Sequence, residues 1–237
     1  MERAVRLLGA APVASRVTTV VLDPLVTRSV LSVLGAALNG EAVFKGRSVF
    51  AGRQGEAVST GVVTLIEDPT VAEAFGAAPY DAEGVPTRRR ILIEQGVLGG
   101  FLYDTVTGRR AGERTTGSAV RAGFASAPGV GARALAFAPG PRDPESILAG
   151  IDDGVYVQSV SGLHSGTNPV SGDFSVGVEG LMIRGGAFAE PVREVTIAST
   201  LLRMLAGVVE VGADLTWLPG GAAGATVVIG DMTLSGS

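Results

Sequence analysis

The chain has one histidine, His164, in a segment of hydroxyl, amide and carboxylate side chains, residues 160–177 (VSGLHSGTNPVSGDFSVG). An imidazole near hydroxyls and a carboxylate can support nucleophilic or acid–base catalysis. The same residue types also build tight turns, because their side chains bond the backbone and glycine adopts positive φ. The segment is therefore a candidate peptide-binding loop or a structural turn. Its candidate site residues are Ser161, His164, Ser165, Thr167, Asn168 and Asp173.

A serine hydrolase triad is disfavoured in this segment. Residues 162–166 (GLHSG) have glycine at both ends, but His164 stands where a nucleophile elbow requires serine. Adjacent residues point in different directions in most backbones, so His164 is poorly placed to act as the base for Ser165. The chain has no second histidine to take that role.

Other common sites are also disfavoured. Residues 129–134 (GVGARA) match a relaxed dinucleotide pattern but follow ASAP rather than a strand, and Lys45 lacks the upstream glycine of a P-loop. The acidic pairs Glu67/Asp68, Asp81/Glu83 and Asp152/Asp153 lie beside turns, where local hydrogen bonding in solvent is the simpler interpretation. The absence of cysteine excludes disulfides and cysteine-bearing zinc sites.

Composition limits the partners and the compartment. A net charge of −4 and only 5% aromatic residues argue against nucleic acid as a partner. Every apolar run is interrupted before the ~18 residues that a membrane span needs, which argues against a membrane. The N-terminus lacks the long apolar run of a signal peptide, so we expect a cytoplasmic protein.

Short apolar runs separated by many glycines and prolines predict a β-rich fold. The fold class we expect is α+β, with predominantly antiparallel sheet, barrel- or sandwich-like, and a few short helices. Residues 128–144 are expected to form a linker or long surface loop. The expected strands are 17–23, 61–68 and 225–236. The expected hairpins are 88–104, which turns at Gln95-Gly96, and 174–198, which turns at 184–186. The expected helices are 27–40 (capped by Thr27 or Ser29), 143–151 (capped by Asp143) and 199–212.

Three segments together resemble a known family. Residues 78–112 contain Asp-x-Glu-Gly-Val at Asp81–Val85, and residues 165–200 contain Asn-x-x-x-Gly-Asp-Phe-Ser at Asn168–Ser175. The third segment is MTLSG at residues 232–236. They resemble the C-terminal domain of the TldD/PmbA family, often named modulators of DNA gyrase. The resemblance implies that residues 17–237 form that domain, that residues 1–16 end a linker helix, and that the family's N-terminal domain is absent.

The resemblance also implies a paired metallopeptidase. Its TldD-like subunits have a zinc-binding His-Glu-x-x-x-His helix and a downstream cysteine, whereas its PmbA- or TldE-like subunits lack these ligands. In this chain Leu31 and Ala36 stand at the two histidine positions and Ser32 at the glutamate position. The resemblance therefore identifies a PmbA/TldE-like subunit with no catalytic residue and no metal of its own, and zinc is expected in a TldD-like partner.

Three hypotheses for the function remain open. The first is a non-catalytic partner subunit of a zinc metallopeptidase that acts on extended or unfolded peptides or modified peptide natural products. It would hold the peptide by sheet addition and by the polar loop. The second is a stand-alone hydrolase or metabolite-tailoring enzyme that uses loop 160–175, with a carboxylate-bound metal. The third is an interaction module that self-associates as a homodimer.

Overall fold

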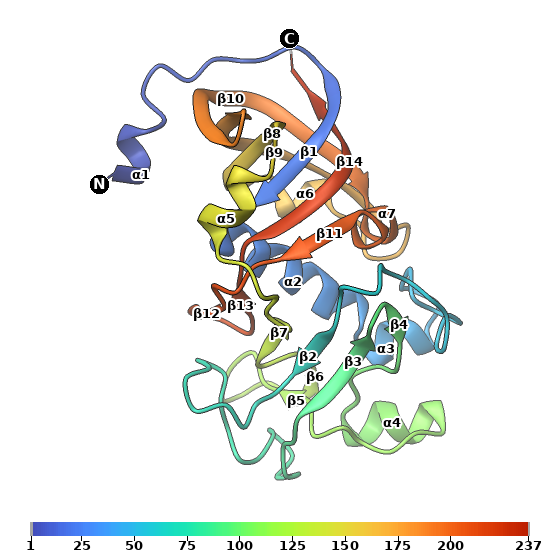
Figure 1. Ribbon diagram of the computed structural model, residues 1–237. Helices are drawn as coiled ribbons and strands as arrows, with labels where there is room; N and C mark the ends of the chain where they lie inside the picture. Colours follow the sequence, from blue (N-terminus) through green and yellow to red (C-terminus); the bar gives the residue numbers. More distant parts are fainter. Residues whose placement is uncertain (1, 237) are drawn as a thin grey trace.

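A closed β-barrel forms the upper half of the molecule in Figure 1. The structure, a computed structural model, describes residues 2–236. The six-stranded sheet has the order β1-β8-β9-β10-β14-β11, and a further pairing between β1 and β14 closes the ring. The pairing of β1 with β8 is parallel, and the other strand pairs in this sheet are antiparallel. Its strands are β1 (Arg16–Leu22), β8 (Asp153–Ser161), β9 (Asp173–Arg184), β10 (Ala187–Thr200), β11 (Val208–Val211) and β14 (Val227–Ser235).

The predicted fold class is confirmed, and so are the first and last strands of the barrel in chain order, β1 and β14, and the long hairpin of β9 and β10. Strands β9 and β10 turn at Gly185 and Gly186, whose φ angles of 54° and 77° are those glycine adopts without strain. Strand β8 was not predicted, because its inward and outward residues do not alternate cleanly and the polar Gln158 is buried.

A smaller sheet forms the lower half of the molecule. Its order is β4-β3-β2-β7, with the hairpin predicted at Gln95-Gly96 confirmed by φ angles of 46° and 85°. The prediction of a surface loop at 128–144 was wrong, because the apolar run Leu135–Phe137 forms the buried strand β7. The short strands of this half are β2 (Leu65–Glu67), β3 (Arg90–Glu94), β4 (Val97–Leu98), β5 (Ala119–Val120), β6 (Gly129–Val130), β7 (Leu135–Phe137), β12 (Thr216–Trp217) and β13 (Ala223–Gly224).

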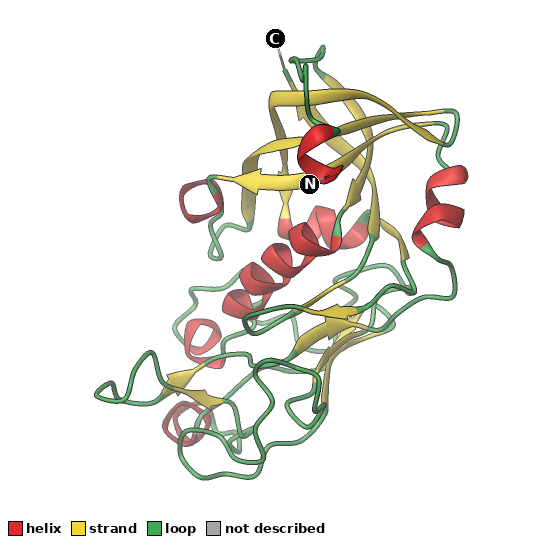
Figure 2. Ribbon diagram, turned by 90° about the vertical axis from the view of Figure 1, so that its left-hand side faces the viewer, coloured by secondary structure: helices red, strands yellow, loops and turns green. Residues whose placement is uncertain are grey.

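Helix α2 (Pro24–Ala37) lies between the barrel and the smaller sheet, as Figure 2 shows, and packs against β7, β8 and β13. It begins earlier than predicted. The carboxylate of Asp23 caps it by accepting a hydrogen bond from the Leu25 backbone N–H at 2.9 Å, and Pro24 occupies the first turn. Thr27, one of the two predicted caps, is instead buried inside the helix.

The remaining helices are short. The prediction of one helix over 199–212 was wrong after residue 206: Gly207 ends α7, and the valines that follow form strand β11. The predicted cap Asp143 is confirmed, since it accepts a hydrogen bond from the Ser146 backbone N–H. These helices are α1 (Glu2–Val5), α3 (Gly40–Phe44), α4 (Thr105–Ala111), α5 (Pro144–Ala149), α6 (Leu163–Gly166) and α7 (Leu201–Ala206).

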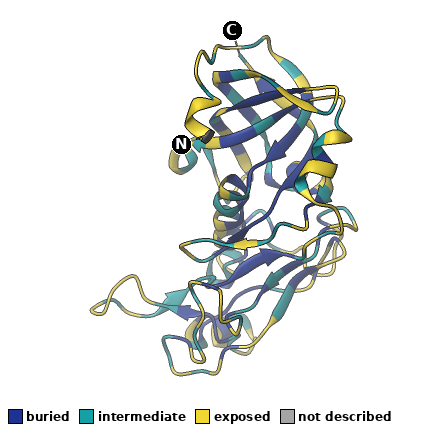
Figure 3. Cartoon of the chain, turned by 60° about the vertical axis from the view of Figure 1, so that its left-hand side comes forward, coloured by how far each residue is buried: buried dark blue, intermediate teal, exposed yellow. Residues whose placement is uncertain are grey.

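One hydrophobic core runs through both halves. Figure 3 shows buried strands in the barrel and in the smaller sheet, with α2 between them. The α2 side chains Val26, Val30, Leu31 and Leu34 belong to this core, so its other face remains for the surface. Within residues 2–236, no helix is both long enough and apolar enough to cross a membrane.

Candidate functional site

A groove follows the exposed side of helix α2. A cavity of about 370 Å³ lies between α2 and α6, and a second of about 330 Å³ lies between α2 and the segment 130–132. Ser32 and Ala36 line both cavities, so the two lie side by side along this part of α2, and they are together called the groove. Its volume is in the range of pockets that hold ligands.

Helix geometry explains why Ser32 and Ala36 lie in this groove. Residues four apart share one side of a helix, and both residues are exposed. Leu31 points to the other side: it is 1% exposed and belongs to the core. The structure therefore brings two of the three motif positions, Ser32 and Ala36, to the groove and leaves the third buried.

These side chains do not fit a zinc ion. Zinc in proteins is bound by imidazole, thiolate or carboxylate groups. Leu31 and Ala36 carry no donor atom, and the Ser32 hydroxyl donates a hydrogen bond to the Arg28 carbonyl oxygen at 3.0 Å. Among residues 2–236 there is also no group of three or more His, Asp or Glu side chains that could hold a metal ion.

The polar loop contributes His164 and Thr167 to the groove. Both line the cavity between α2 and α6, together with Leu163 and Pro169. His164 is exposed and its side chain forms no hydrogen bond with another described residue, whereas the Thr167 hydroxyl donates to the Leu163 carbonyl oxygen at 2.7 Å. The His164 imidazole thus lies beside Ser32 and Ala36, two of the positions that correspond to the zinc-binding motif.

The other candidate residues of the loop bond its own backbone or side chains. The Asn168 side-chain oxygen accepts from the Val170 N–H at 2.9 Å, and the Asp173 carboxylate accepts from the Ser171 hydroxyl at 2.5 Å. The Ser165 hydroxyl donates to the Gly162 carbonyl at 3.2 Å, and Ser161 lies at the end of β8 with a 3.5 Å contact to the Gly177 carbonyl. For these four residues the structural-turn interpretation accounts for the contacts.

The loop is fixed to two distant segments. The Val49 N–H donates to the Pro169 carbonyl at 2.8 Å, and the Leu201 N–H donates to the Gly172 carbonyl at 2.7 Å. Gly172 has a φ of 82°, and a Cβ atom there would meet the Val49 side chain at 3.0 Å. Glycine is therefore required where the loop passes over Val49, and these bonds hold the groove wall in place.

The geometry does not assemble a hydrolytic triad. His164 has no hydrogen bond to Ser165 or to Asp173 in the described residues, and both partners bond elsewhere. A nucleophile and its base lie within hydrogen-bond reach in such sites. Among the described residues the loop therefore holds no hydrogen-bonded pair of nucleophile and base.

The acidic pairs divide into two kinds. Asp81 is buried rather than solvated and also accepts from the Ala119 N–H at 3.0 Å, yet its carboxylate makes the local hydrogen bonds expected of a turn, accepting from the Glu83 and Val85 N–H groups at 2.9 Å each. Glu67 does not: it is 2% exposed and accepts from the Arg133 N–H at 2.7 Å. Burial raises the pKa of Glu67 to about 7, although the Arg133 and Ala134 backbone donors oppose the rise. The expectation of a solvated turn was wrong there, because Glu67 lies within strand β2.

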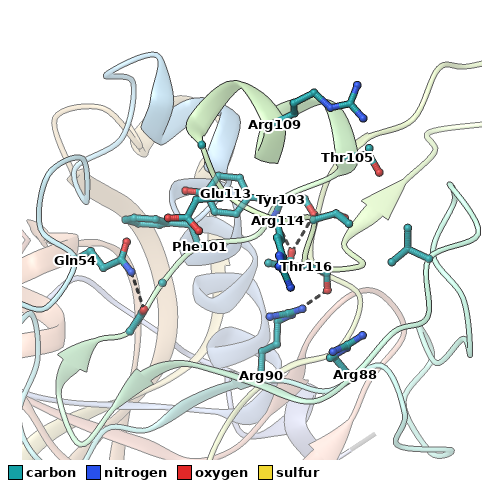
Figure 4. Close-up of a pocket in the computed structure, with 15 residues that line it drawn as sticks. Gln54, Arg88, Arg90, Phe101, Tyr103, Thr105, Arg109, Glu113, Arg114 and Thr116 are labelled. Atoms are coloured by element: carbon teal, nitrogen blue, oxygen red, sulfur yellow. Dashed lines mark hydrogen bonds between the residues drawn. The ribbon is translucent and has the colours of Figure 1, made fainter.

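Sequence reasoning also missed a cavity of about 970 Å³ between β3 and α4, lined by several arginines (Figure 4). The signal was present as the run Arg88-Arg89-Arg90, which enters a predicted hairpin. It could not be used, because the arginines that complete the cavity come from a separate segment after strand β4.

Comparisons with known proteins agree with this fold. The family model described as the PmbA/TldA metallopeptidase C-terminal domain matches residues 15–236. A metalloprotease of Methanothermobacter thermautotrophicus is 33% identical over 233 residues, covering 97% of this chain and 51% of that protein. Metalloprotease PmbA of Escherichia coli O157:H7 is 29% identical over 182 residues, covering 77% of this chain and 38% of that protein.

Solved structures agree as well. A candidate modulator of DNA gyrase from Thermotoga maritima superposes with a TM-score of 0.91 and 29% identity, covering 99% of this chain and 53% of the other. TldE from Thermococcus kodakarensis gives a TM-score of 0.90 and 25% identity, covering 99% and 54%. The chain spans about half the length of these structures. By the match over residues 15–236, the chain belongs to the PmbA/TldA metallopeptidase family and carries its C-terminal domain.

Proposed function

We propose that the chain serves in a non-catalytic partner subunit of a zinc metallopeptidase, with the zinc held by a TldD-like partner. The observation that carries the proposal is the groove along α2. Ser32 and Ala36 line it at positions where the resemblance places a general base and a zinc ligand, and neither can act as one. A groove without metal ligands favours a role in binding over a role in metal chemistry.

The proposed ligand of the groove is an extended or unfolded peptide, including a modified peptide natural product. The wall formed by α6 offers the His164 imidazole and the apolar surface of Leu163 and Pro169. An open groove with apolar walls and a few polar groups suits a chain without fixed secondary structure.

Peptide addition to an edge of the smaller sheet is less favoured. The outer strand β4 is already bonded, since the Leu98 N–H donates to the Glu56 carbonyl at 3.0 Å. The other outer strand, β7, is covered in the same way by a bond of 2.9 Å from the Leu135 N–H to the Gly221 carbonyl. The proposal therefore assigns the peptide to the groove.

The test is reconstitution. This chain and a TldD-like subunit are purified separately and assayed alone and together on a reduced, unfolded protein. The expected result is turnover that requires both components and that falls when Ala36→Phe fills the groove. Leu25→Phe is the matched control, because Leu25 is exposed on the same helix and outside the groove.

Other results would contradict the proposal. Turnover by this chain alone would favour the stand-alone hydrolase, and a homodimer that neither binds the TldD-like subunit nor affects its activity would favour the self-associating module. Equal effects of Ala36→Phe and Leu25→Phe would remove the groove from the account.

A further inference from the structure

The cavity between β3 and α4 carries a strong excess of positive charge. Figure 4 shows Arg88 and Arg90 on the β3 side of the cavity and Arg109 on α4 at its edge, with the Arg109 guanidinium directed away from the other two. A fourth arginine, Arg114, follows α4, and Glu113 supplies the one carboxylate of the lining. Four guanidinium groups against one carboxylate leave most of this charge without a counter-charge in the wall.

None of these arginines forms a salt bridge within the part of the chain that the structure describes. Arg89, between Arg88 and Arg90 in sequence, behaves differently: its Nε lies 3.9 Å from the Asp68 carboxylate, and it does not line the cavity. Arg88, just before β3, and Arg90, its first residue, thus line the cavity, whereas Arg89 between them does not.

Arg90 is held in position at the edge of the cavity by a hydrogen bond to the backbone. It is half-buried, and its Nε donates to the Thr116 carbonyl oxygen at 2.9 Å. Its two terminal nitrogens have no partner among residues 2–236, so they remain available as donors. Burial and the nearby Arg88 charge lower the pKa of Arg90. Like charges gathered in a partly desolvated cavity repel each other, and a bound anion relieves that repulsion.

The shape and lining of the cavity favour a peptide over a nucleic acid. The volume of about 970 Å³ admits several residues of a peptide, whereas a nucleic-acid backbone needs an extended basic face. Guanidinium groups bind carboxylates through paired hydrogen bonds. Between the charges the wall offers the Phe101 ring and the hydroxyls of Tyr103 and Thr105, which suit peptide side chains and amides.

We propose that this cavity binds an acidic peptide, with Arg88, Arg90 and Arg114 holding its carboxylate groups. The cavity shares no lining residue with the groove along α2. The site is therefore separate from the groove of the proposed metallopeptidase subunit, and its test uses this chain alone.

The experiment is isothermal titration of the chain with a pentapeptide of alanine and glycine that ends in two glutamates. Three probes identify which carboxylate the site binds: the peptide with a free C-terminus, the same peptide amidated, and a version with both glutamates replaced by glutamine. Inorganic phosphate is titrated separately. The variants are Arg88→Gln with Arg114→Gln, and Arg89→Gln is the matched control. Arg88, Arg89 and Arg114 are exposed, and thermal melting verifies that each variant folds.

The proposal expects saturable binding that weakens by about tenfold or more in the double variant, because each charged hydrogen bond contributes substantially. Binding should change less than about twofold in Arg89→Gln, and it should weaken as ionic strength rises. Loss of binding on amidation assigns the site to a C-terminal carboxylate, and loss with the glutamine version assigns it to acidic side chains. Absence of saturable peptide binding, binding of phosphate alone, or an equal loss in Arg89→Gln would overturn the proposal.

Discussion

Ser32 of helix α2 and His164 of helix α6 line the same cavity, although they lie far apart in the sequence. Ser32 stands at the position of a general base in the zinc-binding motif that the chain resembles, and His164 is the single imidazole of the chain. The sequence alone did not show that the polar loop and helix α2 lie close together in space. The cavity that they share brings the motif position and the polar loop together in one candidate site.

The first prediction concerns His164. Replacing it by alanine should raise the KM for an unfolded peptide in the reconstituted complex by about three- to tenfold, because the groove loses one contact side chain without losing a reacting group. The free energy of unfolding should change by less than about 0.5 kcal/mol, since the side chain is exposed. Ser165→Ala is the control: its hydroxyl bonds the Gly162 carbonyl, and it does not line the cavity. If both variants process peptide like the unmodified chain, the loop is a structural turn.

The second prediction tests the two faces of α2. Leu31→His should lower the free energy of unfolding by about 2–4 kcal/mol, because it removes an apolar side chain from the core and buries a polar ring. Ala36→His lies on the exposed face and should change it by less than about 0.5 kcal/mol. Urea unfolding of the two variants measures the difference. Equal destabilisation would mean that the two positions do not lie on opposite faces.

The third prediction concerns the start of α2. Asp23 is 1% exposed; it accepts hydrogen bonds from the Leu25 N–H at 2.9 Å and from the Tyr156 hydroxyl at 2.7 Å, and it forms a salt bridge with Arg3. Asp23→Ala should cost about 2–4 kcal/mol, because it removes a helix cap and leaves buried donors unpaired. Tyr156→Phe should cost about 1 kcal/mol. The double variant should cost less than the sum, since both changes remove the same hydrogen bond. Additive losses in chemical denaturation would contradict this contact.

The fourth prediction is a pH dependence from Glu67. Burial raises the pKa of Glu67 from 4.5 to about 7, so the folded protein holds this proton more tightly than the unfolded chain does. Its contribution to stability is therefore complete below about pH 4.5 and is lost as the pH rises through 7. Each unit of pKa shift corresponds to about 1.4 kcal/mol, so the stability lost is on the order of 3 kcal/mol.

Glu67→Gln provides the comparison, because its amide oxygen can still accept from the Arg133 and Ala134 N–H groups. The difference in unfolding free energy between the two proteins, measured from pH 4.5 to 8, should change over the interval in which Glu67 ionises. A constant difference across that range would contradict the buried, protonated carboxyl.

Much of the barrel could be predicted from the sequence, because alternating apolar runs and glycine turns determine β9, β10 and β14 locally. Other elements depend on contacts that no local pattern shows. Strand β11 was not predicted because its apolar run also fits a helix. Strand β7 was not predicted because the glycines and prolines around it indicate a loop. The cap at Asp23 was missed because helix-forming residues follow Thr27 and Ser29 equally well.

The site was predicted in part. Residues at the motif positions were identified through the resemblance, but their opposite faces on α2 follow from packing against the core. For the polar loop the sequence left both a turn and a binding loop open: in the structure His164 and Thr167 line the groove, while Asn168 and Asp173 make hydrogen bonds within the turn. The arginine cavity requires two segments to meet in space, so composition and local patterns could not reveal it.

The central claim is that this chain contributes to peptide cleavage without holding the metal. The most direct test is elemental analysis of the chain alone and in a purified complex with a TldD-like subunit, with peptidase activity measured on the same samples. The account predicts less than about 0.1 zinc per chain alone, one zinc per complex, and activity in the complex that disappears when the partner's zinc-binding histidines are replaced. Stoichiometric zinc with turnover in the isolated chain would contradict it.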